Sequence, residues 1–498
     1  MNWGFWLPLM VVMSSMIPGL LIFLLPEERA VTRTLLNLGG ALLKLALIAV
    51  MLWGVYYDRG YETRITLLPG FDLVMHASAL AMFFVVLSGL LWLLTTIYAI
   101  GYLEGGQNKS RFFGFFSICV SATTGIALAG NLFSFVVFYE LLTLATYPLV
   151  VHRGTPESLK AGRVYLAYTL AGGAMLMLGV IWLHSLVGPF DFVEGGALAP
   201  YQAEHAQLLT VIFFLLIAGL GVKASLVPLH GWLPLAMVAP APVSALLHAV
   251  AVVKAGAFGI VRVVYDVYGV RVVEVLGLDE ILAGLAALTI LYGSVLALHQ
   301  DNLKRRLAYS TVSQVSYIVL GVAIAGPLAT IGGIVHLVHQ GLMKITLFFC
   351  AGNLGETIGV HRISAMNGVG RRMPLTMAAF TIAALAMIGI PPLAGFVSKW
   401  YLGVGALEVG ENWVIAVLVA SSLLNAAYFL PIINAAWFNP PDGPWPKDVR
   451  RGRLETMPTL LWPPVITACA VVLAGVLANM PFSPLDWVKL IANRLYLP

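Results

Sequence analysis

Charged residues are scarce in this sequence. Only 10% of its 498 residues are Asp, Glu, Lys or Arg, whereas 60% are hydrophobic, and the mean hydropathy is +0.91. A soluble domain contains about 25% charged residues. The scarcity therefore leaves little room for a soluble domain and predicts a polytopic membrane protein. The formal net charge of +5 does not indicate nucleic-acid binding, because the basic residues lie in short loops between apolar runs, where membrane topology explains them.

The sequence also lacks the motifs of common enzymes. Its three cysteines match no metal or redox spacing and lie inside apolar runs, so we interpret them as packing residues. It has no Walker loop, dinucleotide fingerprint, CxxC, HExxH or nucleophile elbow. We therefore expect no resident cofactor or metal, and a transport subunit rather than an enzyme. Such a chain moves charge only with energy from an ion gradient or from a partner protein.

Long hydrophobic runs dominate what is present. A membrane-spanning helix needs about 20 apolar residues. The first run lacks a basic start and a cleavage site, so we expect it to be retained as a helix. The predicted fold class is an all-α polytopic membrane protein, a single transmembrane domain over residues 1–498. Its fourteen expected helical segments are residues 4–25, 34–56, 73–100, 112–129, 131–151, 162–187, 208–236, 242–268, 273–298, 307–325, 328–352, 374–402, 412–438 and 459–480.

Basic residues are distributed unevenly among the loops. With these segments, 17 of the 28 Lys and Arg lie beside loops that follow odd-numbered segments, and 6, Arg262 among them, are assigned to the other side. Cytoplasmic loops are enriched in basic residues. The distribution predicts that the odd loops are cytoplasmic and that both termini lie outside. The longest basic loop, at 439–457, is interpreted either as a topology signal or as a contact for a partner subunit.

Two segments carry helix breakers near a lysine. Breaks are expected at Pro228 and Pro234 in segment seven and at Pro391 and Pro392 in segment twelve. Proline in a membrane helix frees backbone carbonyls that protein or water must satisfy, because lipid cannot. The breaks therefore predict places where water or an ion reaches the membrane interior.

The two breaks also suggest internal symmetry. They lie five segments apart, and an odd offset inverts the topology. Interrupted segments at corresponding places in two halves are typical of transport sites. We therefore expect two inverted five-helix repeats, formed by segments four to eight (residues 112–268) and nine to thirteen (residues 273–438).

Ionisable residues inside the apolar segments are the candidate functional residues. Each costs about 2.5–3.5 kcal/mol at membrane depth on insertion scales, so a functional role is the default explanation. Glu140 in segment five is the clearest case, since no other carboxylate lies within ten residues of it. We expect it to pair with Lys223 in segment seven, which would couple two titrations and permit proton uptake and release. The alternative is a static structural ion pair.

Further candidates follow in the later segments. Lys254 is expected to be the next site, and His248 lies six residues earlier, nearly two turns away on the same side of one helix. In segment eleven, His336 or His339 is expected to link the two half-sites, the first around Lys223 and the second around Lys399. Lys344 is a weaker candidate. For the histidines, the alternative is a hydrogen-bonded packing residue. Metal binding by the histidine pair is disfavoured, because no carboxylate or cysteine accompanies it.

The remaining candidates are less uniform. Lys399 follows the second break and is expected to end the path, whereas the alternative is a side chain that snorkels to the membrane surface. His230 and Lys44 are weaker candidates, and for Lys44 snorkelling or an inter-subunit contact is as reasonable as function. Segment ten adds polar residues, from Ser310 to Tyr317, that would hold water or bond neighbouring helices.

With these residues in place, the sequence closely resembles the antiporter-like subunits shared by Mrp-type cation/proton antiporters, respiratory complex I and membrane-bound hydrogenases. The resemblance covers roughly residues 70–440 and is carried by three motifs: GVKASLVPLHGWLPLAMVAPAPVSALLHAVAVVKAG, DNLKRRLAYSTVSQVSYI and GIPPLAGFVSKW. It implies that Glu140 pairs with Lys223. It also implies that Lys254 and Lys399 continue a hydrated proton path along the membrane midplane.

The resemblance implies a proton-translocating subunit of a multisubunit complex. The lysine at position 399 makes the sequence resemble the D-type chain of Mrp antiporters, and this resemblance predicts sodium–proton exchange. The combination of His248 with Lys254 keeps an alternative open, a proton-pumping subunit of a complex I-type NADH-quinone oxidoreductase or of a membrane-bound hydrogenase. The expected partners are other membrane subunits, lipid and protons, with sodium ions in the first case. The expected location is a bacterial or archaeal cell membrane.

Overall fold

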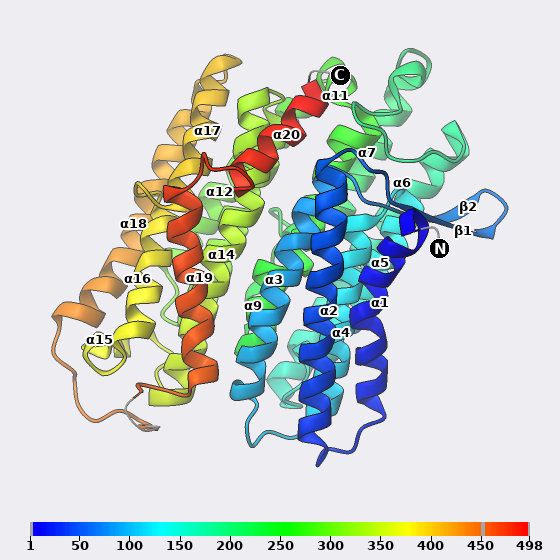
Figure 1. The fold of residues 1–498 in the computed structure, drawn as a ribbon. Coiled ribbons are helices and arrows are strands. Elements are labelled where there is room, and N and C mark those ends of the chain that lie inside the picture. Colours follow the sequence, from blue (N-terminus) through cyan, green and yellow to red (C-terminus); the bar gives the residue numbers. More distant parts are fainter. Residues whose placement is uncertain (1–2, 450–453, 497–498) are drawn as a thin grey trace.

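The computed structural model describes residues 3–449 and 454–496, and its long helices pack side by side (Figure 1). Twelve helical stretches in this described part are long and apolar enough to cross a membrane. The first half of the chain contributes α1 (Trp3–Phe23), α2 (Ala30–Tyr56), α3 (Ala79–Tyr102), α4 (Lys109–Leu128), α5 (Leu132–Val150), α6 (Pro156–Val187), α7 (Gln202–Ala224), α8 (Trp232–Leu235), α9 (Ala241–Ala249) and α10 (Val252–Arg262). The second half contributes α11 (Val270–Val275), α12 (Leu278–Leu298), α13 (Leu303–Ala323), α14 (Pro327–Ile358), α15 (Val369–Arg372), α16 (Pro374–Ile388), α17 (Ala394–Glu408), α18 (Trp413–Phe438), α19 (Pro458–Val476) and α20 (Pro484–Tyr496).

The fold class predicted from the sequence is confirmed. The twelve spanning stretches account for twelve of the predicted segments. The tenth segment is α13, which is 21 residues long but rich in polar residues, and the twelfth is the pair α16 and α17. The start of α1 and the end of α20 lie at the same end of the bundle, as an even number of crossings requires (Figure 1).

A β-hairpin lies at this end of the bundle, which we call the hairpin end. Strands β1 (Glu62–Leu68) and β2 (Phe71–His76) pair antiparallel around a turn at Gly70. The sequence interpretation began the third helix at residue 73, and that boundary is wrong. The alternating, β-branched residues of β1 and the Pro–Gly turn favour a hairpin. Helix α3 begins only after Ser78, whose hydroxyl caps it by accepting a hydrogen bond from the Ala81 amide at 3.1 Å.

The opposite end, which we call the basic end, carries the loops that follow the odd-numbered segments. These loops contact one another: the Leu303 amide donates to the His361 carbonyl at 3.0 Å, and an Arg111 guanidinium donates to the His152 carbonyl at 3.2 Å. Part of the basic loop at 439–457 lies here too. Its arginines at positions 450, 451 and 453 lie outside the described residues.

The structure contains both predicted helix breaks. Helix α7 ends at Ala224, and Ser225 adopts a left-handed conformation with φ of 58°. Pro228 lies in the following turn, whereas Pro234 lies in the short helix α8. At the second break, Pro391 and Pro392 separate α16 from α17.

The eighth segment is interrupted as well, which the sequence did not predict. Val250 (φ −127°, ψ −51°) and Ala251 (φ −98°, ψ −89°) leave the helical conformation and separate α9 from α10. The expectation that His248 and Lys254 share one face of a single helix is therefore wrong. Beyond α10, residues Val263–Tyr268 continue as a π-helical turn, η3.

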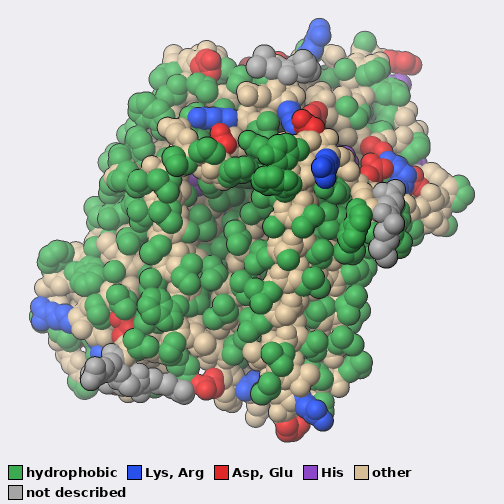
Figure 2. All heavy atoms as spheres, viewed as in Figure 1, with side chains coloured by type: hydrophobic (Ala, Val, Ile, Leu, Met, Phe, Trp, Pro, Cys, Tyr) green, Lys and Arg blue, Asp and Glu red, His purple; other side chains and the backbone are tan. Residues whose placement is uncertain are grey.

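Polar and apolar side chains divide the surface into bands. In Figure 2, the visible Lys, Arg, Asp and Glu side chains gather near the two ends, and a hydrophobic band lies between them. The amphipathic helix α20, which the sequence analysis did not expect, packs at the hairpin end against α3 and α14. Its Trp487 indole donates to the Ala79 carbonyl at 2.9 Å.

Candidate functional site

Lys223 lies in the last turn of α7, at the first helix break. Its side chain is fully buried. The ammonium group donates to the Tyr139 carbonyl on α5 at 2.5 Å and lies 3.3 Å from the centroid of the Tyr139 ring. In the described structure it forms no ion pair with Glu140, so the predicted direct pair is absent, although the two charges are close enough to interact. Lys223 thus takes a backbone carbonyl as its partner.

Glu140 points instead toward α6. Its side chain is only partly buried, but its Oε1 atom is buried and has no hydrogen-bond partner among the described residues. A Cβ atom at Gly173 of α6 would overlap Oε1. The glycine therefore makes the space in which the carboxylate lies. The carboxylate is held near Lys223 without being locked to it.

Lys254 lies on α10, beyond the break in the eighth segment. Its fully buried ammonium group donates to the Leu337 carbonyl on α14 at 2.7 Å. Two residues later, Gly256 packs against the end of α7, where a Cβ atom would lie 2.8 Å from the carbonyl carbon of Lys223. The Lys254 charge is close enough to His336 to interact with it. Lys254 thus lies between the first half-site and α14.

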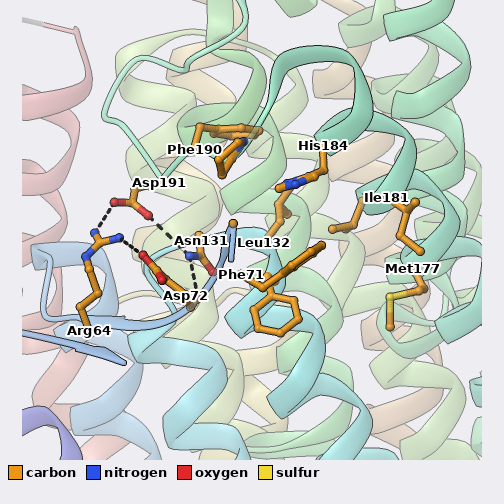
Figure 3. A pocket seen from close by; sticks show the side chains of 14 residues that line it. Arg64, Phe71, Asp72, Asn131, Leu132, Met177, Ile181, His184, Phe190 and Asp191 are labelled. Atoms are coloured by element: carbon orange, nitrogen blue, oxygen red, sulfur yellow. Dashed lines mark hydrogen bonds and ion pairs between the residues drawn. The ribbon is translucent and has the colours of Figure 1, made fainter. Parts of the chain in front are cut away.

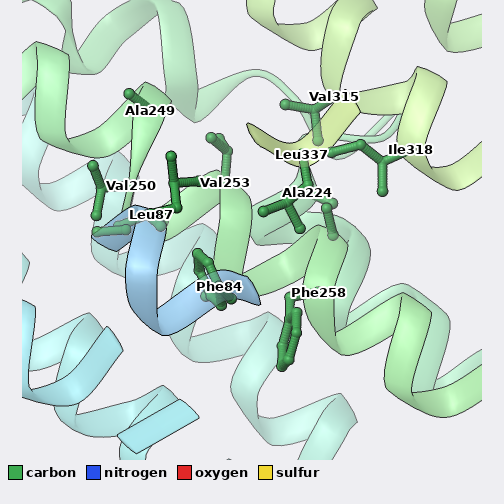
Figure 4. Close-up of a cluster of buried hydrophobic side chains, with 14 of the residues drawn as sticks. Phe84, Leu87, Ala224, Ala249, Val250, Val253, Phe258, Val315, Ile318 and Leu337 are labelled. Carbon is green, nitrogen blue, oxygen red and sulfur yellow. The ribbon is translucent and has the colours of Figure 1, made fainter. Parts of the chain in front are cut away.

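Apolar side chains fill the space around these broken helices (Figure 4). They come from α3, α7, α9, α10, α13 and α14, together with the break between α9 and α10. The labelled members are Phe84, Leu87, Ala224, Ala249, Val250, Val253, Phe258, Val315, Ile318 and Leu337. This apolar cluster adjoins Lys223 and Lys254, whose neighbours Ala224 and Val253 belong to it.

The histidines contact α14 or lie on it. His248 stacks on Phe348 with ring centroids 4.4 Å apart. Lys254 contacts α14 at Leu337, which lies eleven residues before Phe348, or about 16 Å along the helix axis. His336 shares a hydrogen bond of 2.8 Å with the Ser398 hydroxyl on α17. The structure therefore places His336, but not His248, next to the second half-site.

Lys399 lies at the second break. Its ammonium group donates to the carbonyls of Met387 and Ile388 at 3.1 and 2.8 Å and to the Ser422 hydroxyl at 2.9 Å. Those carbonyls belong to the last turn of α16, where a helix leaves carbonyls unpaired. The sequence interpretation of a lysine associated with the break matches this geometry, and its side chain is held by the break rather than extended to the membrane surface.

A hydrogen-bonded chain connects this lysine with Lys344. The Lys344 ammonium donates to the Ser310 hydroxyl at 2.6 Å, and Ser310 is bonded to the Tyr428 hydroxyl at 2.9 Å. Tyr428 is bonded to Asn425 Oδ1, and the Asn425 amide donates at 3.1 Å to the Met387 carbonyl. The same carbonyl binds the ammonium group at the second break. Lys344, a weaker candidate in the sequence, is therefore connected to the end of the predicted path.

Several buried polar groups near these lysines have no hydrogen-bond partner among the described residues. Buried polar groups almost always have one, from protein or from ordered water. Both ring nitrogens of His248 and both amide ends of two glutamines are in this group. The ring of His339 lies beside the backbone of Ala394 without a hydrogen bond of good geometry. Besides Glu140 Oε1, the side chains near these lysines with such atoms are His248, Gln314, Tyr317, His336, His339, Gln340 and Ser421.

Two weaker candidates lie elsewhere. Lys44 is fully buried inside the chain and donates to the Thr124 hydroxyl at 2.7 Å, so the snorkelling and inter-subunit interpretations are both wrong for this residue. His230 lies beyond the first break, with its ring centroid 5.2 Å from that of Tyr292. Neither belongs to the group around α14.

A pocket of about 550 Å³ opens beside the hairpin, away from the buried lysines. Figure 3 shows Arg64 between Asp72 and Asp191, with Phe71 and His184 further inside. The stacked Phe71 and His184 rings lie 4.9 Å apart. The ion pairs tie the hairpin to the loop after α6. The pocket therefore belongs to the hairpin end rather than to the candidate path.

Some buried polar residues escaped the sequence analysis. Asn425 and Tyr428 sit one turn apart in an apolar segment, and that spacing was the available signal. Arg262 was counted with the basic residues of the outer side, although it lies within the predicted eighth segment; in the structure it is buried in α10 and pairs with Asp266 at 2.5 Å. The pair at i and i+4 with opposite charges was a signal that favours a helix.

Comparison with known proteins adds sequence relationships to this geometry. The profile of the family described as "NADH:quinone oxidoreductase/Mrp antiporter, TM" matches residues 129–425. The chain is 37% identical over 451 residues to the NADH-quinone oxidoreductase subunit N of Desulforudis audaxviator, covering 87% of each protein. It is 30% identical over 409 residues to the D-type chain of the Na(+)/H(+) antiporter of Bacillus subtilis, covering 81% of this chain and 80% of that protein.

The fold is also similar to a solved structure. A chain in the structure of the Mrp complex from Dietzia sp. DQ12-45-1b superimposes with a TM-score of 0.85. The match covers all of this chain and 98% of that one, at 23% identity. At that identity the likeness concerns the fold alone.

Proposed function

The chain belongs to the NADH:quinone oxidoreductase/Mrp antiporter family, and we propose that it is a proton-translocating, antiporter-like subunit of a multisubunit membrane complex. The proposed path runs through Glu140, Lys223, Lys254 and Lys399. Its direction is along the membrane midplane, through both half-sites. The six other candidates contribute less directly: His248, His336, His339, Lys344, His230 and Lys44.

One observation carries the proposal. Four lysines each donate to a backbone carbonyl, and none forms an ion pair among the described residues: the fully buried Lys223, Lys254 and Lys344, and the half-buried Lys399. A buried ion pair resists neutralisation, because removing one charge strands the other. A lysine held by a neutral carbonyl can release its proton without stranding a carboxylate. These sites therefore suit proton transfer better than static pairing.

Glu140 would modulate the first site. When the carboxylate approaches Lys223, it favours the ammonium form, and when it withdraws toward Gly173, it favours proton release. The glycine space described above gives it a position for the second state. The proton then crosses the apolar cluster to Lys254, which requires transient water in that region.

The second half-site would receive the proton through α14. His336, Lys344 and the chain of Ser310, Tyr428 and Asn425 lead toward Lys399. The orphaned polar groups around α14 would bind ordered water, which commonly satisfies such groups in protein interiors. We further propose that residues 112–268 and 273–438 are inverted repeats, with one break and one lysine in each.

Two assemblies fit these features. The first, expected from the sequence, is a sodium–proton antiporter in which this chain has the role of the D-type chain, with sodium bound at an interface rather than among the lysines. The second is a redox-driven, complex I-type complex, and the 37% identity to a subunit N favours it. In both, we propose a bacterial or archaeal cell membrane with the basic end in the cytoplasm and both termini outside.

The test uses inverted membrane vesicles that contain the native complex, with and without the substitution Lys399→Ala. A sodium pulse without an electron donor, or a donor without sodium, is followed with a pH-sensitive dye. Proton movement lost in the variant supports the proposed function, and the effective trigger identifies the assembly. Proton movement that Lys399→Ala leaves at the wild-type rate contradicts the proposed path.

A further inference from the structure

A second line of buried polar side chains runs between α1, α2 and α4, outside the path described above. All of its members are at most 6% exposed. On α4 they lie seven, four and three residues apart, so they share one face of the helix. We call this line the polar stripe, and it consists of Ser15, Arg33, Asn37, Lys44, Ser110, Ser117, Ser121 and Thr124.

The polar stripe opens at the basic end. There the Arg33 guanidinium donates to the Ser110 hydroxyl at 2.9 Å. The Glu27 carboxylate accepts hydrogen bonds from the amides of Lys109 and Ser110 at 2.9 and 3.0 Å. Glu27 itself is exposed to solvent. An exposed carboxylate is thus hydrogen-bonded directly to the first member of the stripe.

Hydrogen bonds continue the stripe inward. The Ser117 hydroxyl donates to the Asn37 side-chain oxygen at 3.0 Å. One turn deeper, the Ser121 hydroxyl shares a bond of 2.6 Å with that of Ser15. Serine and threonine also serve simply to hold membrane helices together, so the stripe alone does not indicate transport. Its inner end supplies the independent observation.

At the inner end lies Lys44, with the Thr124 hydroxyl at 2.7 Å as its hydrogen-bond partner. Its ammonium group is 5.3 Å from the ring centroid of Trp92. The Trp92 indole nitrogen and the Thr96 hydroxyl are fully buried and have no hydrogen-bond partner among the described residues. An unpartnered indole nitrogen therefore belongs to a ring beside the buried amine, and the unpartnered Thr96 hydroxyl lies one turn further along α3.

No carboxylate balances this amine. Helices α1, α3 and α4 pack against α2, and their described residues include no Asp, Glu or His. On α2 itself, the other ionisable side chains are Arg33 and Tyr56. The ionisable side chains on the packed helices are Tyr98, Tyr102, Lys109, Arg111 and Cys119. A permanently charged lysine without a counter-charge is costly inside a membrane protein.

We propose that Lys44 is a protonatable site of this chain, loaded with protons from the basic end along the polar stripe. The ligand of this site is the proton itself. The inference rests on the proposed function, because it adds a second entry to a subunit that moves protons. Helix α4 lies between Lys44 and the first half-site: Thr124 contacts Lys44, whereas Cys119 of the same helix lies near Lys223.

The experiment compares lysine substitutions in the purified complex, reconstituted into liposomes and driven by its own energy source. Lys44→Met removes the amine, and Lys44→Arg keeps a charge that cannot be released, because arginine stays protonated. Both are expected to slow proton uptake from the basic end about tenfold, a change of about 1.4 kcal/mol in barrier. Lys160→Met, at an exposed position on α6, is the matched control.

The outcomes separate this inference from the proposed function. Wild-type uptake in Lys44→Met, together with loss of uptake in Lys223→Met, overturns the Lys44 site and leaves the main path intact. Wild-type uptake in Lys44→Arg would show that a fixed positive charge is sufficient at this position, and it would also overturn the proposal that Lys44 binds and releases protons. If the Lys44 variants fail to assemble, Ser121→Ala decides, since a functional stripe requires slower uptake and an unchanged rate overturns the proposal.

Discussion

At the scale of single residues, the space around Glu140 is as informative as its charge. The carboxylate occupies the volume that a side chain at position 173 would fill. The Gly173→Ala substitution should therefore push the carboxylate away from its observed position and slow proton translocation without changing any charge. The measurement is the rate of proton translocation by the reconstituted complex. We expect this rate to fall about tenfold, which corresponds to a barrier higher by about 1.4 kcal/mol.

A second glycine provides the control. Gly39 on α2 has open space where a Cβ atom would lie. Alanine also favours a helix over glycine by up to about 1 kcal/mol. Gly39→Ala should keep the wild-type rate. If Gly173→Ala also keeps the wild-type rate, the position of Glu140 toward α6 has no role in transport.

His152, in the turn after α5, should make stability depend on pH. Burial, together with the nearby Arg111 and Arg153, lowers the pKa of its ring from 6.5 to about 4. The unfolded chain then binds more protons between these values, so stability is complete above pH 6.5 and is lost as pH falls toward 4. His152→Gln should reduce the drop in melting temperature between pH 7 and pH 5.

The control for that measurement is His299→Gln, which changes an exposed ring. It should keep the drop seen in the wild type. An equal drop in His152→Gln would show that other groups cause the acid sensitivity. Measurements in detergent on the purified complex suffice, because only the difference between two pH values is compared.

At the scale of elements, the second break and Lys399 depend on each other. The ammonium group satisfies two carbonyls that the end of α16 leaves unpaired. An unsatisfied buried group costs about 1–3 kcal/mol. Lys399→Met should therefore lower thermal stability as well as transport, whereas Ser422→Ala, which removes a single hydroxyl partner, should affect both less. Equal effects of the two substitutions would contradict the capping role.

The π-helical turn after α10 carries a buried ion pair that should matter for stability. Arg262 and Asp266 are both nearly inaccessible to solvent and lie 2.5 Å apart. Removing one partner of a buried pair typically costs about 3–5 kcal/mol, because the other charge is left uncompensated. Asp266→Ala should destabilise the protein by that order, measured by unfolding in detergent. The double substitution Arg262→Met with Asp266→Leu should recover most of the loss; no recovery would contradict an uncompensated charge.

The sequence predicted the long apolar helices and both proline breaks, because spanning length and proline are local signals, but it did not predict the amphipathic helix α20. It missed the break between α9 and α10, since Val250 and Ala251 carry no helix-breaking signal. The sequence also predicted an ion pair between Lys223 and Glu140 that the structure does not contain. Whether the lysine bonds to a carboxylate or to the Tyr139 carbonyl depends on how helices distant in sequence pack together. The roles of the site residues remain predictions.

At the scale of the whole molecule, the proposed path would cross the bundle from helix to helix rather than follow one helix. Lys223, Lys254 and Lys399 belong to three different helices, and each lies at or just beyond an interruption. At Lys399 the break supplies the acceptors, because the end of α16 leaves the Met387 and Ile388 carbonyls unpaired. Lys223 and Lys254 instead use the Tyr139 and Leu337 carbonyls, which lie within the continuous helices α5 and α14.

The central claim is that protons move through buried lysines that release them. The most direct measurement is proton translocation by the reconstituted complex with Lys223→Met, Lys223→Arg and the control Lys160→Met. The account predicts normal assembly in all three, wild-type rates in the control, and loss of translocation in both Lys223 variants, because arginine cannot release a proton. Translocation at the wild-type rate in Lys223→Arg would contradict it, since a fixed charge would then be sufficient.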